Sequence, residues 1–404
     1  MNTMNILFLS ISSLPPLTEH GISLDLIRQL KEHGHKVYVV CSNERRNGQP
    51  TALVEECGCR VLRVRIGNNK NTNIIEKGIT NMLLPYQYIS AIEKFFSHVK
   101  FDAVLYPTPP VTQAATVEYI KKRDGAKSYL LLKDIFPQNA VDIGMMTKTG
   151  PKSIIYKMFR RKEEKLYRLS DYVGCMSQAN VDFLLRHNPY ISADKVHVNP
   201  NSIEVFPYER DEAKKAEIYE KYGIPTYATT FIYGGNLGRP QDIPFVIECL
   251  KANADKPDRF FIVCGNGTEY PKLKAYVEEH KPSNVLLING LPKAEYEDFV
   301  KAFDVGLIFL DHRFTIPNFP SRLLSYMQSR MPVLACTDAN TDIGQVITDG
   351  GFGWWCESNS TEAFTAKVEE AIAADRKVMG DKGYEYLVEH YTSAHSYDIL
   401  MKHL

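Results

Sequence analysis

The sequence predicts an α/β protein of two domains, each built on a doubly wound parallel sheet. A chain of 404 residues is too long for one ordinary hydrophobic core and suits two domains of similar size. Short apolar runs alternate with helical patterns along both halves, which is typical of parallel strands joined by helices. Gly, Pro, Asp or Ser flank these runs, as expected where strands end.

The first half opens with an apolar run that predicts a buried strand at residues 5–11, followed by a helix at 23–33. Pro15 and Pro16 end this run early and no basic region precedes it, so it does not fit a secretory signal. Further strands are expected at residues 36–41, 60–66, 103–106, 127–132, 172–176 and 196–199.

The second half repeats the alternation after a charged stretch at residues 209–222. Its strands are expected at residues 229–233, 260–264, 284–288, 304–309, 332–335 and 353–355. The predicted domains are therefore 1–203 and 204–380. The last segment, 381–404, carries aromatic and aliphatic residues at helical spacing and is expected as a helix that packs back on the first domain.

The composition, 44% hydrophobic and 24% charged, is that of a soluble globular protein, and no apolar run is long enough to cross a bilayer. The eight cysteines are scattered singly, apart from Cys57 and Cys59, whose spacing is not that of a zinc site. We therefore expect a cytoplasmic protein with reduced thiols.

The zero net charge conceals an asymmetry between the halves. Residues 1–200 hold 27 Lys and Arg against 18 Asp and Glu, which leaves 21 against 30 for the remainder. Two amphipathic stretches, 74–99 and 154–169, lie in the basic half. These features fit either contact with the anionic inner face of a membrane or ordinary helices with a solvated basic side. No nucleic-acid partner is expected.

Three glycine turns follow strands of the second half and are candidates for binding phosphate or a base. In the first, Gly235, Asn236 and Gly238 free the backbone, and Arg239 supplies a cation for a diphosphate. The second contains Gly265, but the bulky Tyr270 stands where a dinucleotide-binding fingerprint needs a small residue. In the third, a base would meet the main chain of Asn289, Gly290 and Leu291. The second and third turns are also explained by a plain turn after a strand.

The run from Phe314 to Met327 is the most informative stretch of the chain. Pro320 and Ser321 are expected to open a helix, which would aim amide donors and Arg322 at an anion. Ser325 would lie one turn further along the same face.

The first half offers weaker candidates. His20 and Gly21 lie in a loop before a helix, and Asp134 follows a strand at the edge where open α/β sheets place their ligands. A helix or turn cap explains Asp134 equally well. His33 and His35 lack further ligands nearby, so no metal site is expected.

At these residues the sequence resembles the retaining glycosyltransferases of the large family four, which have the two-domain GT-B fold. The resemblance covers nearly the whole chain and is strongest to the bacterial branch that builds surface polysaccharides, including fucosamine transferases. The matching motifs occur in family order: the Gly21 loop, Glu32–Val37, Lys133–Pro137, Ser170–Tyr172 with Ser177, Asn199–Ile203, Gly235–Gly238, Gly265–Gly267 and Pro320–Arg322.

The resemblance implies a first domain that binds the acceptor and a second that binds a nucleotide diphosphate sugar, with UDP the expected nucleotide and no cofactor or metal. The resemblance implies that Arg239 and Arg322 are the catalytic residues. Asp134 is the alternative candidate for a general base. The implied donor residues are Gly235, Asn236, Gly238, Gly265, Asn289, Gly290, Leu291, Pro317, Asn318, Phe319, Ser321 and Ser325. The acceptor side would include His20, Gly21 and the segment 107–110 with Pro109.

One departure bears on function. The family usually carries two glutamates eight positions apart, one contacting the transferred sugar and the other the ribose, where this chain has Pro317 and Ser325. The expected activity is transfer of a sugar to a hydroxyl of a polyprenyl-diphosphate-linked glycan in capsule, O-antigen or exopolysaccharide synthesis. Two alternatives stay open: a nucleotide-sugar 2-epimerase of the same fold, and a degenerate protein that binds nucleotide sugars without catalysis.

Overall fold

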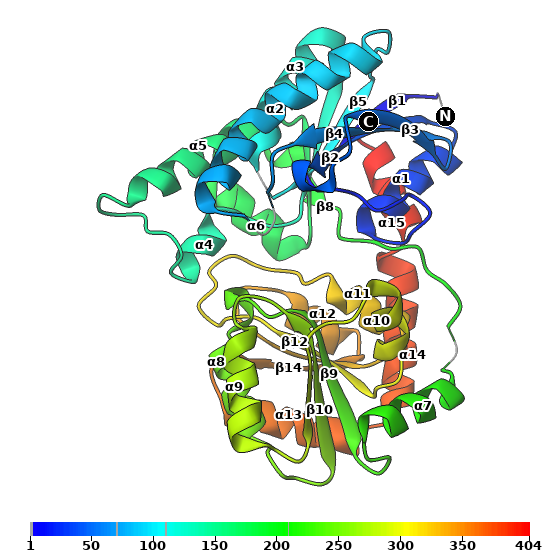
Figure 1. Cartoon of the computed structure of the whole chain (residues 1–404), viewed down its shortest axis with the longest axis vertical. Helices are drawn as coiled ribbons and strands as arrows, with labels where there is room; N and C mark the ends of the chain where they lie inside the picture. The colour runs from blue at the N-terminus through cyan, green and yellow to red at the C-terminus, as the bar shows by residue number, and fades with distance from the viewer. Residues whose placement is uncertain (1–2, 70–71, 110, 209) are drawn as a thin grey trace. The chain divides into compact units, whose positions relative to one another are not determined.

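The computed structural model describes residues 3–69, 72–109, 111–208 and 210–404, and they form two compact units. The first unit holds residues up to Glu204 together with Thr392–Leu404, and the second holds Val205–Tyr391. The chain therefore returns to the first unit for its last residues, which are red in Figure 1.

The first unit is built on an eight-stranded sheet in the order β3-β4-β2-β1-β5-β6-β7-β8. All neighbours pair in parallel except β3, which runs antiparallel to β4. The sequence reasoning missed β3 because its run is short and its side chains are half-exposed or exposed. The strands are β1 (Asn5–Leu9), β2 (Lys36–Glu44), β3 (Ala52–Glu56), β4 (Cys59–Ile66), β5 (Ala103–Thr108), β6 (Lys127–Leu132), β7 (Tyr172–Cys175) and β8 (Val196–Val198).

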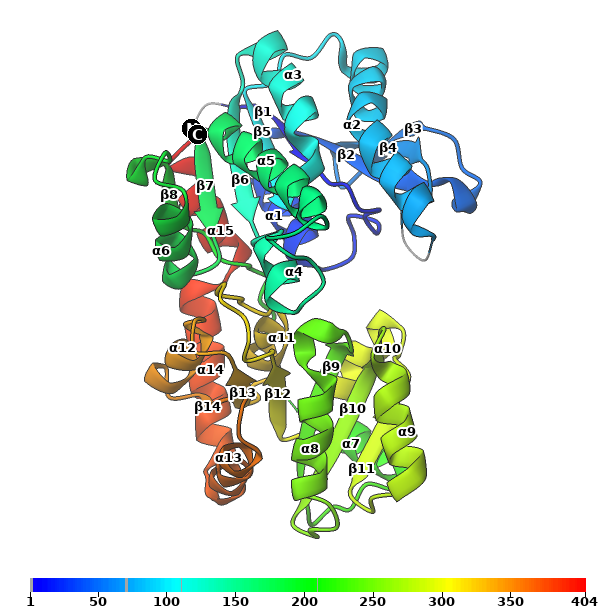
Figure 2. The ribbon, with the colours of Figure 1, turned by 90° about the vertical axis from the view of Figure 1, so that its left-hand side faces the viewer.

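Helices cover both faces of this sheet. One face packs on α1 and α15 through aliphatic side chains of β1, β2 and β5. Figure 2 shows α5 in front of β6 and α15 behind it. The helices are α1 (Ile22–Glu32), α2 (Ile74–Phe96), α3 (Ala114–Asp124), α4 (Gln138–Asp142), α5 (Ser153–Leu169), α6 (Gln178–His187) and α15 (Ser393–Met401), with short 3-10 turns η1 (Arg45–Asn47), η2 (Val111–Gln113) and η3 (Ala193–Lys195).

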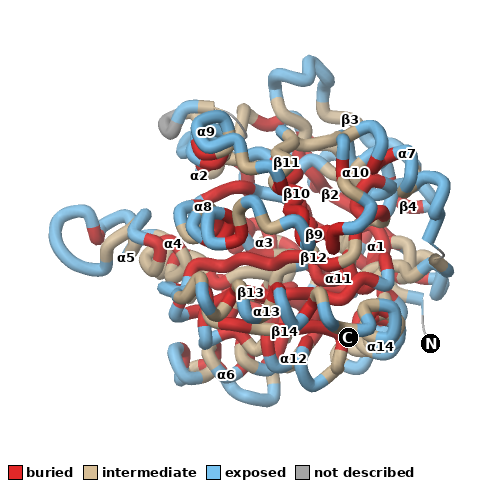
Figure 3. The backbone as a smooth tube through the Cα atoms, turned by 90° about the horizontal axis from the view of Figure 1, so that it is seen from below, coloured by how far each residue is buried: buried red, intermediate tan, exposed pale blue. Residues whose placement is uncertain are grey.

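The second unit is a six-stranded, fully parallel sheet in the order β11-β10-β9-β12-β13-β14. Its core joins α8, α9 and α13 to one face of the sheet, and Figure 3 shows the strands buried between helices whose outer sides are exposed. The strands are β9 (Thr229–Asn236), β10 (Arg259–Asn266), β11 (Val285–Ile288), β12 (Val305–Phe309), β13 (Val333–Thr337) and β14 (Gly353–Glu357). The helices are α7 (Glu212–Tyr222), the 3-10 turn η4 (Arg239–Gln241), α8 (Ile243–Ala252), α9 (Tyr270–His280), α10 (Lys293–Val300), α11 (Arg322–Gln328), α12 (Ile343–Asp349), α13 (Thr361–Ala373) and α14 (Arg376–His390).

The C-terminal segment differs from the single helix expected at 381–404. The structure divides it into α14, which belongs to the second unit, and α15, which belongs to the first. Tyr391 and Thr392 separate the two helices, and Thr392 caps α15 by accepting a hydrogen bond from the backbone N–H of His395 at 3.0 Å. In α15 the buried Tyr397 stacks on His33, with ring centres 3.8 Å apart. A hydrophobic pattern that continues across a short break cannot show where the chain changes units.

Candidate functional site

The order of strands in the second unit reverses between β9 and β12, which is where open α/β sheets bind ligands, beyond the carboxyl ends of the strands. These two strands pair only through Val305 with Phe231 and Gly306 with Ile232. Further along, the hydroxyl of Tyr326 on α11 bridges them, because it donates toward the carbonyls of Ile232 at 3.2 Å and Leu307 at 3.1 Å. Sequence reasoning missed this role of Tyr326, since periodicity shows a buried face but not what it meets.

The structure brings the three glycine turns of the second unit together. A Cβ at Gly265 would overlap the carbonyl oxygen of Gly235, and one at Gly290 would lie 3.2 Å from the Asn266 side chain. Gly290 also has a φ of +70°, which favours glycine. Asn289 is exposed and Leu291 half-buried at the same turn. The turns that the sequence reasoning singled out therefore form one surface at the carboxyl edge of β9, β10 and β11.

Arg322 reaches this surface from the start of α11. Its guanidinium carbon lies 4.2 Å from the centre of the Tyr233 ring, and its Nη2 would lie 3.0 Å from a Cβ at Gly235. Its Nη1 is buried and has no hydrogen-bond partner, and no carboxylate pairs with Arg322 among the residues that the structure describes. A buried cationic donor without a partner requires an anion or water for its hydrogen bonds.

Arg239 has a different environment. It is exposed at the start of η4, and its Nε lies 4.0 Å from Oε1 of Glu269 at the start of α9. Beside it, the Gln241 side chain accepts hydrogen bonds from Nδ2 of Asn236 and the N–H of Gly238, both at 3.1 Å. The turn is thus rigid around Gly238, while the arginine side chain is on the surface.

The segment expected to hold the donor sugar is fixed by residues that the sequence reasoning missed. Pro317 and Phe319 are buried and Asn318 is half-buried. The hydroxyl of Thr341 donates to the carbonyl of Asn318 at 2.5 Å, and Nδ2 of Asn340 donates to the carbonyl of Phe314 at 2.6 Å. A cluster of Asp, Asn and Thr after a strand was the signal that could have found them.

A helix opens at this point as expected, with Ser321 as its N-cap, but Pro320 lies before the cap and not at the first helical position. The helix α11 begins at Arg322 and has seven residues, and the Ser321 side chain makes no capping hydrogen bond. The chain enters α11 through a tight turn, in which the N–H of Leu323 donates to the carbonyl of Pro320 at 3.2 Å. In so short a helix the aligned peptide dipoles add little, so the guanidinium of Arg322 is the main positive group. Ser325 is half-buried one turn beyond it.

In the first unit, Lys133 and Asp134 follow the carboxyl end of β6. Burial raises the pKa of Asp134 to about 6, although the backbone N–H of Ile135 and the side chain of Asn139 oppose the rise by hydrogen bonding. Burial also lowers the pKa of Lys133 to about 7. The Oδ1 atom of Asp134 is buried and has no hydrogen-bond partner within the described part of the chain, whereas Nδ2 of Asn139 donates to Oδ2 at 2.8 Å.

Unpartnered polar atoms also follow the neighbouring strand β5, whose Thr108 pairs with Leu132 of β6. The hydroxyls of Thr108 and Thr112 and both polar atoms of the Gln113 side chain are buried, and none has a hydrogen-bond partner among the residues that the structure describes. Gln113 is 1% exposed. Such groups normally find partners, so a polar ligand or water belongs at this edge of the sheet. Sequence reasoning named Pro109, which is exposed, but missed these side chains; Pro110 lies outside the described residues.

The Gly21 loop is held by α1. The buried carboxylate of Asp25 accepts a hydrogen bond from the N–H of Gly21 at 3.0 Å. Arg28 donates to the same carboxylate at 2.6 Å and also lies 2.9 Å from Nδ1 of His20. His20, Asp25 and Glu204 are close enough to bind a metal ion, but the Arg28 guanidinium already contacts all three.

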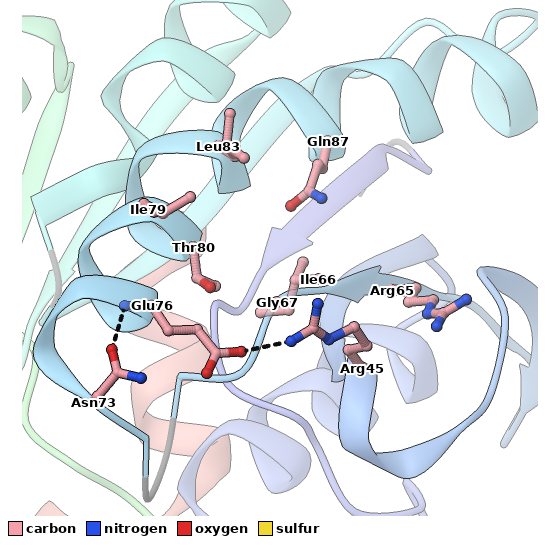
Figure 4. A pocket seen from close by; sticks show the side chains of 10 residues that line it. All are labelled: Arg45, Arg65, Ile66, Gly67, Asn73, Glu76, Ile79, Thr80, Leu83 and Gln87. Carbon is pink, nitrogen blue, oxygen red and sulfur yellow. Dashed lines mark hydrogen bonds and ion pairs between the residues drawn. The ribbon is translucent and has the colours of Figure 1, made fainter.

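A pocket of about 670 Å³ opens in the first unit between β4 and α2. Figure 4 shows Arg45 and Glu76 facing each other across it, with their charged groups 3.0 Å apart. Ile79 and Leu83 give the pocket an apolar wall on α2, and Arg65 lies at its rim. Arg65 has no ion-pair partner among the described residues. The pocket therefore combines an apolar wall with cationic groups.

Comparisons with known proteins agree with this architecture. Residues 214–386 match the family model of the glycosyl transferases group 1, which covers most of the second unit. The chain is 24% identical to WbjE of Pseudomonas aeruginosa, named a probable glycosyltransferase, over 80% of this chain and 79% of WbjE. It is 22% identical to WcaI of Escherichia coli strain K12, whose name places it as a glycosyl transferase in colanic acid biosynthesis, over 68% of this chain and 67% of WcaI.

Solved structures show the same fold. HepE of Anabaena, solved in complex with UDP-glucose, superposes with a TM-score of 0.70 at 13% identity, covering 99% of this chain and 98% of HepE. No helix among the described residues has the length and apolar character that a membrane crossing requires. The group 1 match, the two named relatives and the shared architecture together identify the protein as a glycosyltransferase of the GT-B fold.

Proposed function

We propose that the protein moves a sugar from a UDP-linked donor, bound by residues 204–380, to a hydroxyl of a lipid-linked glycan, bound by residues 1–203, with retention of configuration at the anomeric carbon. The observation that carries the donor half of the proposal is Arg322. Its guanidinium is fixed on the Tyr233 ring at the strand-order reversal, and its buried Nη1 lacks a partner. A diphosphate would satisfy that donor and neutralise its charge.

UDP is the proposed nucleotide because HepE, with the same fold, was solved with UDP-glucose. The base would lie on the main chain of Asn289, Gly290 and Leu291, and the diphosphate beside Gly235, Asn236 and Gly238. The sugar would lie against Pro317, Asn318 and Phe319, whose segment Thr341 and Asn340 hold in place. The close approach of Gly265 to Gly235 supports this arrangement, since side chains there would fill the donor surface.

Retaining transfer would break the bond between the anomeric carbon and the phosphate oxygen and form a bond from that carbon to the acceptor oxygen on the same face. Charge develops on the leaving diphosphate, so Arg322 would stabilise the transition state more than the ground state. Arg239 would contribute if it turns from Glu269 to the phosphates. The acceptor proton would pass to the leaving phosphate oxygen, or to Asp134, whose pKa of about 6 suits a base near neutral pH.

A lipid-linked acceptor is proposed from the first unit and from the relatives. The pocket of Figure 4 offers an apolar wall beside Arg45 and Arg65, which suits an amphiphile with a phosphate group. WcaI is named for synthesis of a polysaccharide, colanic acid. The sugar end of the acceptor would use the hydroxyl of Thr112, the side chain of Gln113 and Oδ1 of Asp134. His20, Gly21 and Pro109 are proposed as further residues of the acceptor side. The proposed place of action is the cytoplasmic face of a membrane, where the protein would serve capsule, O-antigen or exopolysaccharide synthesis.

The first experiment is a thermal-shift panel of UDP, GDP, ADP and their sugars, each with Mg²⁺ and with EDTA. A ligand at a hundred times its Kd stabilises the folded state by about 2.7 kcal/mol, so UDP and one UDP-sugar should raise the midpoint by on the order of 5 °C. The shift should persist in EDTA. Stabilisation by a purine nucleotide alone would refute the choice of UDP, and stabilisation by none would favour the non-catalytic alternative.

A further inference from the structure

Three tyrosine rings lie close to Arg322 in the second unit. The guanidinium carbon of Arg322 lies 4.2 Å from the centre of the Tyr233 ring, and Tyr326 follows one turn along α11. The third ring is that of Tyr296 on α10. Burial and the neighbouring Tyr326 hydroxyl raise the pKa of Tyr296 far above its usual range, and the nearby Arg322 guanidinium opposes part of that rise. Tyr296 is therefore a neutral hydroxyl beside the cation of the candidate donor site.

Two of the three hydroxyls are used within the protein. Tyr233 donates to the carbonyl of Asn236 at 2.7 Å. The Tyr326 hydroxyl contacts backbone groups of β9 and β12, including the carbonyl of Leu307 at 3.1 Å. The Tyr296 hydroxyl, in contrast, has no hydrogen-bond partner among the residues that the structure describes, and its side chain is half-buried. A phenol in such a position has a proton to donate and needs an acceptor for it.

Two consecutive glycines let Tyr296 and Arg322 approach the carboxyl end of β9. A Cβ at Gly234 would overlap the hydroxyl oxygen of Tyr296, and one at Gly235 would lie 3.0 Å from Nη2 of Arg322. Gly235 has a φ of +128°, which favours glycine, whereas the φ of Gly234 is not positive. The backbone conformation alone does not require glycine at residue 234, but the close approach of the Tyr296 hydroxyl does.

This end of β9 therefore holds two hydrogen-bond donors for which the described part of the chain supplies no acceptor. One is the buried Nη1 of Arg322, and the other is the hydroxyl of Tyr296. They come from different helices, α11 and α10, and Gly235 beside them is exposed. A phosphate oxygen accepts more than one hydrogen bond and also neutralises a guanidinium, which a water molecule cannot do. One oxyanion would thus satisfy both donors.

We infer that the Tyr296 hydroxyl donates a hydrogen bond to an oxygen of the diphosphate that Arg322 binds. This inference rests on the proposed function and adds a donor-binding residue to it. The hydrogen bond would favour a nucleoside diphosphate over the nucleoside alone. Because negative charge grows on the leaving diphosphate during transfer, the same hydrogen bond would also stabilise the transition state.

The test is Tyr296→Phe, which removes the hydroxyl oxygen and keeps the ring. Isothermal titration with UDP, and with uridine at millimolar concentration, separates the contribution of the diphosphate from that of the nucleoside. The affinity for UDP should fall by about tenfold to a hundredfold, as for other hydrogen bonds to charged groups, and the affinity for uridine should not change. The midpoint of thermal unfolding without ligand should be equal or higher, because the hydroxyl has no protein partner to lose.

The variant Tyr222→Phe is the matched control. Tyr222, on α7, is also half-buried, and its hydroxyl likewise lacks a hydrogen-bond partner in the described ranges of the chain. Its ring packs edge-on against Phe299 of α10, with ring centres 5.4 Å apart. The control therefore makes the same change against the same helix, and its affinity for UDP should equal that of the unmodified protein.

A double variant tests whether the hydroxyl and the guanidinium bind the same phosphate. Two groups that share one ligand atom are coupled, so their effects do not add. Tyr296→Phe should therefore lower the affinity for UDP by a smaller factor in the Arg322→Met background than in the unmodified protein. Equal factors in the two backgrounds would show that the two groups act on separate parts of the ligand, and would overturn the inference.

The remaining outcomes separate this inference from the proposed function. Equal affinity of Tyr296→Phe and Tyr222→Phe for UDP would overturn the inference alone. An equal loss for UDP and for uridine would assign the hydroxyl to the nucleoside and overturn it as well. Binding of GDP or ADP in place of UDP, with the same loss in Tyr296→Phe, would support the inference and refute only the choice of UDP. If the unmodified protein binds no nucleoside diphosphate, both the inference and the proposed function are wrong.

Discussion

The ring of Tyr326 on α11 lies against Gly306 of β12, so closely that a Cβ at Gly306 would overlap the ring. The hydroxyl of the same tyrosine is within hydrogen-bond distance of the carbonyls of Ile232 and Leu307 and of the N–H of Gly234. Through these contacts α11 is held against β9 and β12, and Arg322, one turn before Tyr326, is fixed beside Gly235.

Replacing Gly306 with Ala should therefore destabilise the protein by about 1–3 kcal/mol, because the ring must move in a closely packed core. The free energy of unfolding, measured by urea denaturation, checks this. Gly78 is a matched control, since a Cβ there meets nothing within 4 Å and the residue lies within α2. Gly78→Ala should be neutral or slightly stabilising. Equal losses in the two variants would contradict the packing argument.

Replacing Arg322 with Met keeps much of the side-chain volume but removes the cation. If the diphosphate binds there, kcat/KM should fall by about a hundredfold to a thousandfold, as for other groups that stabilise developing charge. Arg330 is the control, because it also lies over a tyrosine, 4.1 Å from the Tyr384 ring centre, but is paired with Asp381 at 2.6 Å. Arg330→Met should leave the KM for the donor unchanged from that of the unmodified protein. Normal turnover by Arg322→Met would remove the main support for the proposed donor site.

Asp134 should make the stability of the protein depend on pH. Its folded-state pKa of about 6 is raised above the ordinary value of 3.8, so the folded protein binds more protons than the unfolded chain between these values. Stability from this group is thus present below about pH 4 and is lost as pH rises to 6. Asp134→Asn should therefore stabilise the protein at pH 7.5, by roughly 1–3 kcal/mol, and have little effect at pH 4. Thermal unfolding at the two pH values measures the difference; an equal effect at both would contradict the raised pKa.

The Asp134→Asn variant also tests whether Asp134 is the base that takes the acceptor proton. If Asp134 takes the acceptor proton, activity of the unmodified protein should fall below about pH 6, and Asp134→Asn should lose most of its turnover while the donor KM is unchanged. If the leaving phosphate takes the proton, the variant should keep substantial turnover.

Ser325 stands where the resemblance expects a glutamate that contacts the ribose. Ser325→Glu should strengthen UDP binding by about tenfold, since hydrogen bonds to a charged group contribute roughly 1.5–3 kcal/mol. Isothermal titration with UDP measures this change. Weaker binding would show that the donor surface of this chain has adapted to the serine.

Alternating apolar runs and glycine turns are local features, and they were enough to predict the α/β class, a change of unit near Glu204 and every parallel strand among the described residues. The sequence also pointed to Arg322 and the glycine turns. The antiparallel pairing of β3, the return of the chain to the first unit at Thr392 and the missing cap hydrogen bond of Ser321 could be seen only in the folded protein. The tertiary structure alone placed Tyr233 and Tyr326 around Arg322 and left Gln113 buried without partners among the described residues. The reason is physical: these properties depend on side chains that are distant in the chain and meet only when the sheet has formed.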